Sequence, residues 1–578
     1  MTISFAAVLL AACVGEAPSD DAPTPPPIEV MAGLPLSLPS GTTAEITEAD
    51  LAARIEILAD DAFEGRAPGS EIGEKTADWL AAEMERIGVA PAGEDGTYFQ
   101  TVRMVEQTLD HAASSLAFSG GRSGDDYAMQ LTDTAVMWTK RQTGSEVLFK
   151  DSELVFVGYG VVAPEYDWND YAGIDVTGKT VVMLVNDPGY ARGDELFNGA
   201  NMTYFGRWTY KFEEAARQGA TGAIIVHETA PASYGWDVVA NSWGGTQADL
   251  VRPDQGLERT AFEAWITQNT ARALFAEARL DFTQLKRAAR KRDFQAVKMG
   301  ELTASGRIVQ TLKETQSRNV IGVLPGQTAA DEHVMYTAHW DHLGKKPRDR
   351  TGGPTQDFYR DEIFNGAVDN ATGTAALLEI AEKFAGTPRA RSVLLTAVTL
   401  EESGLLGSAY YAENPTVPLS QIVAGINMDG MLPLGRTTDM IVVGYGASEL
   451  EDRLAEVLAE QDRVITPDPN PEAGYFYRSD HISFAKKGVP MLYADGGIEK
   501  REGGLAAGRA AAETYTTRRY HKPMDEYARS WDLSGMQEDV TALWMVGERI
   551  ADSSDWPTWY PGSEFEAVRK ASLASGQR

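Results

Sequence analysis

Two adjacent carboxylates, Glu401 and Glu402, directly follow residues 391–400, a run typical of a buried β-strand. Like charges side by side raise the cost of ionising both groups, so the pair indicates that a cation lies in front of it. Other residues that can bind a metal ion lie on both sides of this pair, in the same half of the chain. They are His339 after 333–338, Asp369 before a predicted helix, Asp429 after 421–428, and His521 further on. Carboxylates and imidazoles suit zinc, and the set predicts a hydrolase with two metal ions.

The elements that would position these side chains alternate between strand and helix from residue 309 onward. Such alternation favours an α/β fold with a largely parallel central sheet. Ligands in these folds gather beyond the carboxyl ends of the strands, so we expect His339, Glu402 and Asp429 to meet at one sheet edge. The predicted strands are 319–323, 333–338, 392–400, 422–428, 440–443 and 489–493, and the predicted helices are 372–384 and 448–461.

The preceding stretch, residues 111–306, has a different pattern. Short strand-like runs at 154–159, 160–163, 180–185 and 222–226 alternate with turn residues, and one helical run lies at 210–218. We predict an inserted β-rich domain over 111–306. The main domain would consist of 46–110, where 47–88 is predicted to be helical around a loop at 64–70, and of 307–578.

The composition limits the class of partner. The 578 residues include 52 Lys and Arg against 84 Asp and Glu, a net charge of −32. This length predicts about two to three domains. So acidic a chain is unsuited to nucleic acid and to an electrostatic patch on a membrane. The charge favours solubility, with attraction of cationic substrates as the alternative.

The first residues resemble a lipoprotein signal. Cys13 is the one cysteine, so an intrachain disulfide is impossible, and Leu10-Ala11-Ala12-Cys13 after the apolar residues 3–10 resembles a bacterial lipoprotein cleavage box. We predict a signal peptide over 1–12, a flexible tether over 13–45 and a lipid on Cys13, which would make the protein exported, periplasmic and lipid-anchored. Because no basic residue precedes the apolar run, a disordered N-terminus is the alternative.

Several short motifs occur together in one order. They are AHWDH (338–342), NGAVDNATGTAALLEIA (365–381), EESGLLGS (401–408), NMDG (427–430), RSDHISF (478–484) and RYH (519–521). The chain thereby resembles the co-catalytic zinc aminopeptidases, the superfamily of aminopeptidase Y, glutamate carboxypeptidase II and the non-catalytic transferrin receptor. The resemblance covers most of 64–534 and implies a three-layer zinc-peptidase fold. Residues 158–184 and 215–226 are similar to the protease-associated domain that is inserted in this superfamily.

The resemblance implies a role for each site residue. Zinc 1 would be bound by His339 and Asp429, zinc 2 by Glu402 and His521, with Asp369 between the two ions. Three further residues would complete the catalytic set: Glu401 as general base, Asp341 as the carboxylate that orients the His339 imidazole, and Tyr520 as the phenol that stabilises the oxyanion. The family pattern also implies a cis peptide bond between Asp369 and Asn370.

The predicted function is removal of N-terminal residues from peptides by water activated at two zinc ions. A dipeptidase or carboxypeptidase on the same site is the first alternative, and a non-catalytic binding protein like the transferrin receptor is the second. The complete ligand set and Glu401 speak against the second, and the two-metal set speaks against a glutaminyl cyclase. Arg478, Tyr475 and Tyr477 are candidates for substrate binding, whereas His342 and His481 are predicted to be structural and stay off the metal list. Oligomeric state is left open.

Overall fold

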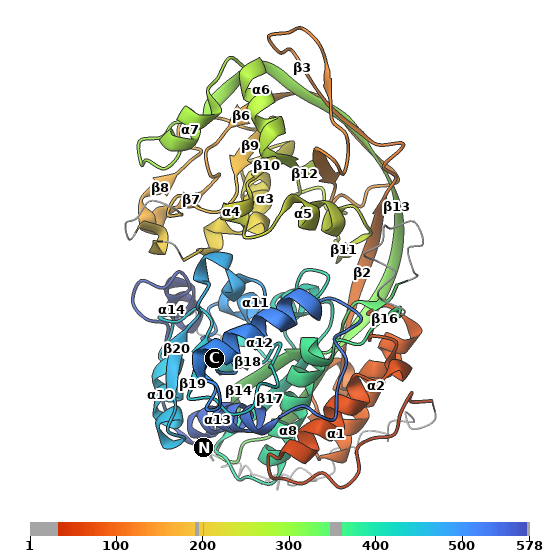
Figure 1. Cartoon of the computed structure of the whole chain (residues 1–578), viewed down its shortest axis with the longest axis vertical. Coiled ribbons are helices and arrows are strands. Elements are labelled where there is room, and N and C mark those ends of the chain that lie inside the picture. The colour runs from red at the N-terminus through yellow and green to blue at the C-terminus, as the bar shows by residue number, and fades with distance from the viewer. Residues whose placement is uncertain (1–32, 191–195, 200, 347–360, 575–578) are drawn as a thin grey trace, which may run out of the picture.

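The computed structural model describes residues 33–190, 196–199, 201–346 and 361–574 (Figure 1). Cys13, the predicted signal peptide and most of the predicted tether lie outside the described residues. Within the described ranges, none of the helices combines the length and the apolar composition needed to cross a bilayer.

The chain forms two lobes joined along one side by two long strands (Figure 1). We call the part with residues 115–246 and 262–288 the upper lobe, and the part with the helices outside these ranges the lower lobe. The joining strands are β2 (Phe99–Leu109) and β13 (Val297–Leu324), which pair antiparallel from Gln310 opposite Leu109 to Val320 opposite Phe99. Because β13 also pairs with strands of both lobes, the predicted domain boundary at residue 306 lies inside one continuous strand.

The lower lobe is built on a mixed sheet whose centre is parallel. Its parallel strands are β17 (Arg391–Val398), β14 (Ala329–His339), β18 (Ile422–Asn427) and β21 (Met491–Asp495), with β13 antiparallel to β17 and β19 (Asp439–Val442) antiparallel to β21. All eight residues of β17 are buried, as expected for a parallel strand that is covered on both faces. This is why the strands read as continuous apolar runs in the sequence.

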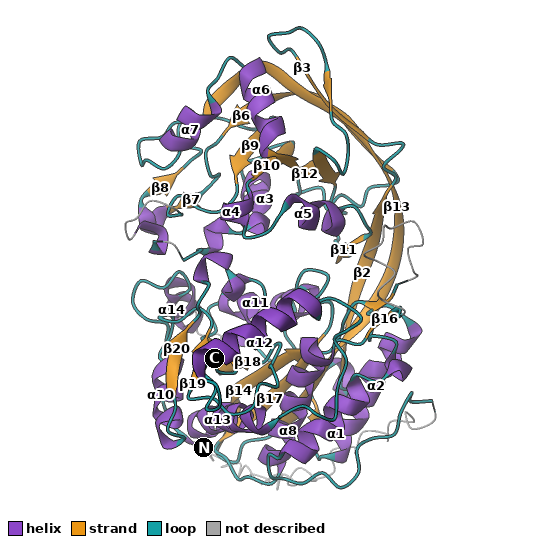
Figure 2. Ribbon diagram, in the orientation of Figure 1, coloured by secondary structure: helices purple, strands orange, loops and turns teal. Residues whose placement is uncertain are grey.

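Helices cover both faces of this sheet, which gives three layers (Figure 2). On one face Val334 and Leu395 pack with α1 (Glu48–Leu58), α2 (Glu71–Arg86), α8 (Gly373–Ala385), α10 (Leu450–Glu460) and α13 (Ser534–Asp552). On the other face Met335 and Leu394 pack with α9 (Leu406–Glu413) and α11 (His481–Ala485). The predicted α/β fold with a mixed, largely parallel central sheet is confirmed.

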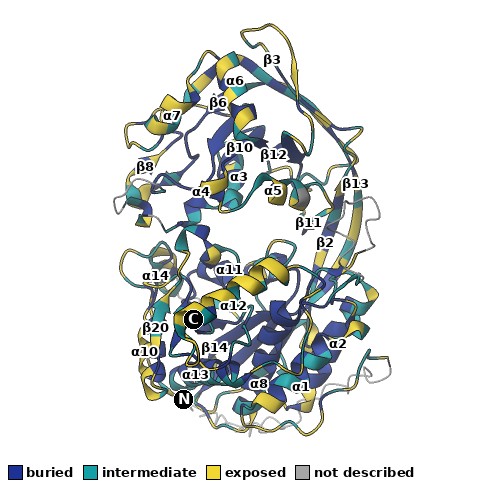
Figure 3. Cartoon of the chain, in the orientation of Figure 1, coloured by how far each residue is buried: buried dark blue, intermediate teal, exposed yellow. Residues whose placement is uncertain are grey.

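The upper lobe has its own sheet and its own apolar cores. Four strands run parallel in the order β6 (Glu146–Phe156), β9 (Thr180–Leu184), β10 (Gly222–His227) and β12 (Phe262–Thr267), and β5 (Ala135–Trp138) is antiparallel to β12. Its further strands are β3 (Ser115–Ser119), β4 (Tyr127–Ala128), β7 (Val162–Ala163) and β8 (Trp168–Asn169). Figure 3 shows the buried sheet at the centre of this lobe.

The prediction that a single helix interrupts the insert is wrong. The helix predicted at 210–218 is α3 (Trp208–Arg217), which packs with α5 (Trp236–Trp243) on one face of the sheet. On the other face lie α6 (Gln268–Glu277) and α7 (Phe282–Ala288). These helices span seven to ten residues, too few for a 3.6-residue period to stand out. The side-chain caps of Thr267 on α6 and Asp281 on α7 are the local signals that indicate them.

Candidate metal centre

The predicted ligands lie at the carboxyl edge of the lower sheet. His339 is the last residue of β14, Glu401 and Glu402 come shortly after β17, and Asp429 comes shortly after β18. Since β14 lies between β17 and β18 and runs parallel to both, the three strand ends are neighbours. The topology therefore brings these side chains to one place, as the sequence predicts.

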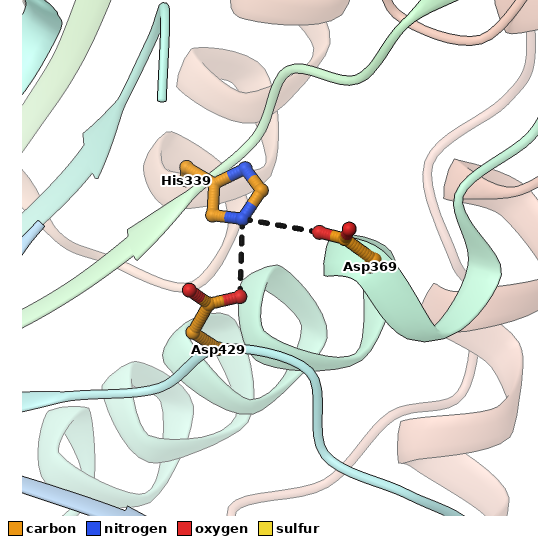
Figure 4. A group of neighbouring side chains, drawn as sticks. All are labelled: His339, Asp369 and Asp429. Atoms are coloured by element: carbon orange, nitrogen blue, oxygen red, sulfur yellow. Dashed lines mark hydrogen bonds and ion pairs between the residues drawn. The ribbon is translucent and has the colours of Figure 1, made fainter. Parts of the chain in front are cut away.

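One group of side chains forms around His339. Its Nε2 lies 3.2 Å from Oδ1 of Asp429 and 3.4 Å from Oδ1 of Asp369 (Figure 4). The three ligand atoms lie within 4.8 Å of one another, close enough to share a metal ion.

A second group forms around His521 on the other side of Asp369. The Nε2 atom of His521 lies 3.1 Å from Oδ2 of Asp369 and 3.2 Å from Oε2 of Glu402. Asp369 thus turns Oδ1 toward one imidazole and Oδ2 toward the other. The structure brings all five predicted ligands together with Asp369 in the middle, the position from which a carboxylate can bridge two ions.

The loop that carries Asp369 is fixed by backbone and side-chain contacts. The peptide bond between Asp369 and Asn370 is cis, which confirms that prediction. The Asn370 amide donates to the carbonyl oxygens of His339 at 3.3 Å and Met428 at 3.1 Å. The carboxylate of Asp525 accepts the backbone N–H of Asp369 at 3.1 Å. These bonds tie the loop to the ends of β14 and β18 and so set the position of Asp369 relative to the other ligands.

Arg66, in the loop predicted at 64–70, was not among the predicted site residues. Its buried guanidinium donates to the carbonyl oxygens of Leu58, Trp340, Asn365 and Gly366 at 2.6 to 2.8 Å. Burial lowers its pKa to about 10, while the nearby carboxylates, Asp369 first among them, oppose that shift. Arg66 therefore stays charged at neutral pH, and it joins the segment after His339 to the segment before Asp369.

Asp341 contacts both His339 and the predicted base. Its carbonyl oxygen lies 3.2 Å from Nδ1 of His339, and its carboxylate Oδ1 accepts the backbone N–H of Glu401 at 3.2 Å. Oδ1 lies 3.9 Å from Nδ1 of His339, beyond hydrogen-bond length. The carboxylate thus holds the Glu401 backbone, and it is the carbonyl oxygen of Asp341 that lies against the imidazole.

The charges of the site indicate that cations belong in it. Burial lowers the pKa of His339, but Asp429, Glu401 and Asp369 oppose burial and hold it well above the usual range. Burial raises the pKa of Glu401 well above its usual range, and repulsion from Asp429, Glu402 and Asp480 adds to the rise. Four carboxylates on Asp369, Glu401, Glu402 and Asp429 carry four negative charges when ionised, which two divalent ions would balance. The donor set therefore fits two zinc ions.

His342, which the sequence analysis leaves off the metal list, lies beside two of the predicted ligands. Its Nδ1 lies 2.6 Å from Oε1 of Glu402, and His342, Asp369 and Glu402 form a second set of atoms within 4.8 Å of one another. The signal in the sequence is the second histidine of AHWDH. His481, in contrast, is buried between Phe476 and Tyr493, with ring centres at 4.6 and 4.9 Å.

We expect His342→Ala to weaken zinc binding by about 10- to 100-fold, because His342 orients Glu402 and groups that orient ligands contribute this much to metal affinity. Zinc affinity is measured by competition with a chromogenic chelator. His333→Ala is the matched control, since His333 is a buried histidine in the part of β14 that precedes the site. Equal zinc affinity of the His342 and His333 variants would contradict the role of His342.

The open side of the site is marked by Tyr520 and His521. Tyr520 is 39% exposed, and so is the side chain of His521. Their rings stack with centres 3.9 Å apart. The preceding helix α12 (Gly504–Arg518) is largely exposed and crosses the front of the lower lobe (Figure 3). A phenol in this position can reach a substrate that enters from solvent.

The predicted substrate residues lie in two different environments. Tyr475 is exposed, and the guanidinium of Arg478 lies 5.2 Å from its ring centre. Tyr477 donates its hydroxyl to Glu564 at 2.7 Å and packs against Tyr204 of the upper lobe, with ring centres 6.2 Å apart. Tyr477 therefore belongs to the contact between the lobes.

A second arginine, from the upper lobe, lies near Arg478. Arg207 caps α3, and burial together with the charge of Arg478 lowers its pKa to about 10. Among the described residues, its Nε has no hydrogen-bond partner. The sequence gives no signal for Arg207, because only the packing of the two lobes brings it close to Arg478.

Comparisons with known proteins relate part of this chain to peptidases. Residues 319–545, which include all five predicted ligands and Glu401, match the model of peptidase family M28. A mouse (Mus musculus) protein, aminopeptidase NAALADL1, is 33% identical over 121 residues, which cover 20% of this chain and 13% of that protein. Aminopeptidase YwaD of Bacillus subtilis (strain 168) is 29% identical over 99 residues, which cover 17% of this chain and 18% of that protein. The matched segments are thus less than a fifth of these relatives' lengths.

Solved structures with a related arrangement include two aminopeptidases. An aminopeptidase from Aneurinibacillus sp. strain AM-1 has 17% sequence identity and a TM-score of 0.47, covering 89% of this chain and 97% of its own. The zinc aminopeptidase BSAP from Bacillus subtilis has 16% identity and a TM-score of 0.42, covering 91% of this chain and 100% of its own. The match to peptidase family M28 over residues 319–545, together with the aminopeptidases among the relatives, confirms the predicted resemblance to the zinc aminopeptidases, whereas the protease-associated and lipoprotein-like resemblances stay predictions.

Proposed function

From the premise that residues 319–545 match peptidase family M28, we propose that this protein is a zinc-dependent aminopeptidase that releases N-terminal residues from peptides. The observation that carries the proposal is the position of Asp369, whose two carboxylate oxygens face His339 at 3.4 Å and His521 at 3.1 Å. A binding protein without catalysis has no need of so many buried carboxylates beside a free base.

Two zinc ions would be held by the chain's own ligands. His339 and Asp429 would bind one ion, Glu402 and His521 the other, and Asp369 both. When bound, zinc in such sites supplies Lewis acidity, which polarises a peptide carbonyl and lowers the pKa of water.

The remaining steps belong to side chains of the protein. The Glu401 carboxylate, which is not one of the five ligands, would take a proton from the attacking water and deliver it to the nitrogen of the leaving amine. Asp341 holds the backbone of this base at 3.2 Å. Tyr520, on the open side, would donate its hydroxyl to the oxyanion of the tetrahedral intermediate. Ser479 supports the ligand set, because its hydroxyl donates to Oδ2 of Asp429 at 2.6 Å and accepts from Asn427 at 2.8 Å.

We expect that blocking the substrate's amine lowers kcat/KM by at least about tenfold, or roughly 1.4 kcal/mol of transition-state stabilisation. A protonated amine would form charge-assisted hydrogen bonds with Glu401 or Asp429, and an acyl group removes that charge. The test compares aminoacyl and N-acetyl-aminoacyl chromogenic substrates, each with and without a chelator. Equal turnover of both substrates would overturn the aminopeptidase assignment and leave the metal centre intact.

One observation favours a second candidate, a dipeptidase or carboxypeptidase on the same site. Arg207 and Arg478 come from different lobes, and they lie close enough for the charge of Arg478 to lower the pKa of Arg207. An anion bound between two arginines offsets the repulsion between their charges. A carboxylate is such an anion, because guanidinium groups donate charge-assisted hydrogen bonds to it. Cleavage of N-acetyl dipeptides with a free C-terminus, together with loss of that cleavage in Arg207→Gln, would select this candidate.

The cellular location is also a proposal. We infer an exported protein that is attached to the bacterial envelope by a lipid on Cys13, on the basis of the Leu10-Ala11-Ala12-Cys13 pattern. Peptides outside the cytoplasm would then be its substrates. Mass spectrometry of the mature N-terminus tests this proposal.

A further inference from the structure

The strand next to the metal centre ends in a further carboxylate, that of Asp495. Strands β18 and β21 run parallel and pair as far as Asn427 opposite Tyr493. Asp429 and Asp495 each come two residues later, so they follow neighbouring strand ends, which are spaced about 4.8 Å apart. Asp495 belongs to neither of the two sets of atoms that lie close enough to share an ion. It therefore lies beside the metal centre without being one of its ligands.

Asp495 is on the same face of the sheet as Tyr493, because alternate residues of a strand point to the same side. On that face Tyr493 belongs to an apolar cluster that includes Phe476. Burial raises the pKa of Tyr493 well above its usual range, and the carboxylates of Asp495, Asp429 and Glu401 add to the rise. Asp495 and the metal centre therefore lie around the same aromatic ring.

No cation balances Asp495 in the part of the chain that the structure describes. Its Oδ1 atom is buried and has no hydrogen-bond partner there. Burial raises the pKa of Asp495 well above its usual range, and three neighbouring carboxylates, those of Asp429, Asp468 and Asp539, raise it further. A buried carboxylate oxygen without a partner is costly, which indicates that a donor from outside the protein belongs here.

Each of the three neighbouring carboxylates has a partner within the chain. The pairs are Asp539 with Arg463, Asp468 with the N–H of Asn470 at 2.8 Å, and Asp429 with the Ser479 hydroxyl at 2.6 Å. Asp495 is thus the carboxylate of this group that is left for a ligand, and the ligand that suits it is a cation. The net charge of −32 favours the approach of such a ligand.

We propose that Asp495 binds the side chain of the substrate's N-terminal residue and that the protein prefers peptides that begin with lysine or arginine. This inference rests on the proposed aminopeptidase function and names its substrate class. The α-amine would be held by Glu401 or Asp429. The apolar stem of the first side chain would then pack on Tyr493, and its charged end would reach Asp495 on the next strand.

The test compares lysyl- and norleucyl-p-nitroanilide as substrates of the full zinc-loaded chain. Norleucine has the same four-carbon side chain without the ammonium group, so the comparison isolates the charge. We expect kcat/KM to be at least about tenfold higher for the lysyl substrate, which is the usual worth of one charge-assisted hydrogen bond.

Two variants assign this preference to Asp495. Asp495→Asn keeps the shape of the side chain and removes its charge, so it should lower the ratio of lysyl to norleucyl kcat/KM at least about tenfold. Asp462→Asn makes the same change at an exposed residue shortly after α10 and should leave the ratio unchanged.

Calorimetric titration supplies a readout without turnover. Zinc-loaded Glu401→Gln should bind L-lysine at least about tenfold more tightly than L-norleucine, and the additional change Asp495→Asn should remove that difference.

Four results would overturn the inference. Equal kcat/KM for the two substrates would show that the side-chain charge is not recognised, and it would leave the aminopeptidase function standing. An equal loss with both substrates in Asp495→Asn would assign Asp495 to the α-amine or to the fold. An equal change of the ratio in Asp462→Asn would assign the preference to the overall charge of the chain. Turnover of neither substrate, with cleavage of N-acetyl dipeptides instead, would overturn the aminopeptidase function and this inference with it.

Discussion

Replacing Glu401 with glutamine should lower kcat by about 10²–10⁴-fold, the usual contribution of general base catalysis, and leave the zinc content unchanged. The reason is geometric, since Glu401 lies among the ligands but none of the contacts between imidazole nitrogens and carboxylates involves it. Glutamine keeps the size of the side chain and removes its ability to take a proton. Steady-state kinetics and metal analysis of the same preparation measure both quantities.

The neighbouring residue provides the matched control. Glu402→Gln is the same chemical change one position along the chain, but Oε2 of Glu402 lies 3.2 Å from His521 and Oε1 lies 2.6 Å from His342. We therefore expect Glu402→Gln to lose zinc, whereas Glu401→Gln keeps it. If both variants lose zinc equally, Glu401 is a ligand, and the base must be sought elsewhere.

The part of the site that follows from sheet topology is predictable from the sequence. Strands β14, β17 and β18 are buried on both faces, so each appears as a short apolar run whose end can be located within a few residues. The rule that ligands gather at the carboxyl ends of parallel strands then assigns His339, Glu402 and Asp429 to one place.

His521 is predictable only from the RYH motif of the family. It follows α12, a helix in which Gly508 is the buried residue, so the helix has no apolar face whose period could reveal it. The same limit explains the missed short helices of the upper lobe. There, packing against the sheet stabilises segments that are too short to be recognised as helices by themselves.

Contacts between distant segments were not predictable. Arg66 reaches carbonyl groups of Asn365 and Gly366, which lie about 300 residues further along the chain, and Arg207 approaches Arg478 from the other lobe. No local pattern of charge or hydrophobicity distinguishes such arginines from exposed ones. The predicted boundary at residue 306 falls inside β13, a single strand that both lobes share, so no turn in the sequence marks where one lobe passes into the other.

The largest effect is expected for Asp369→Ala, which should reduce the zinc content from about two ions per chain to less than one and abolish most activity. Asp369 is the residue that both groups share, at 3.4 Å from His339 and 3.1 Å from His521. Without it, the two remaining pairs of ligands would each have to hold an ion alone, below the three protein ligands that catalytic zinc sites use. Losing the metal removes several kcal/mol of transition-state stabilisation, at least about 10³-fold in kcat/KM.

Zinc content after dialysis measures this effect, and two further variants separate it from a loss of folding. Asp369→Asn keeps the shape of the side chain and removes its charge, so it should fold as the native protein does and still lose zinc. Asp361→Ala changes an acidic residue of the preceding segment whose carboxylate accepts the N–H of Ile363 at 2.9 Å and lies beside Glu526, neither of which is a predicted metal ligand, and it should keep two ions. Two zinc ions in Asp369→Ala would show that each group holds its ion independently and that the carboxylate between them bridges nothing.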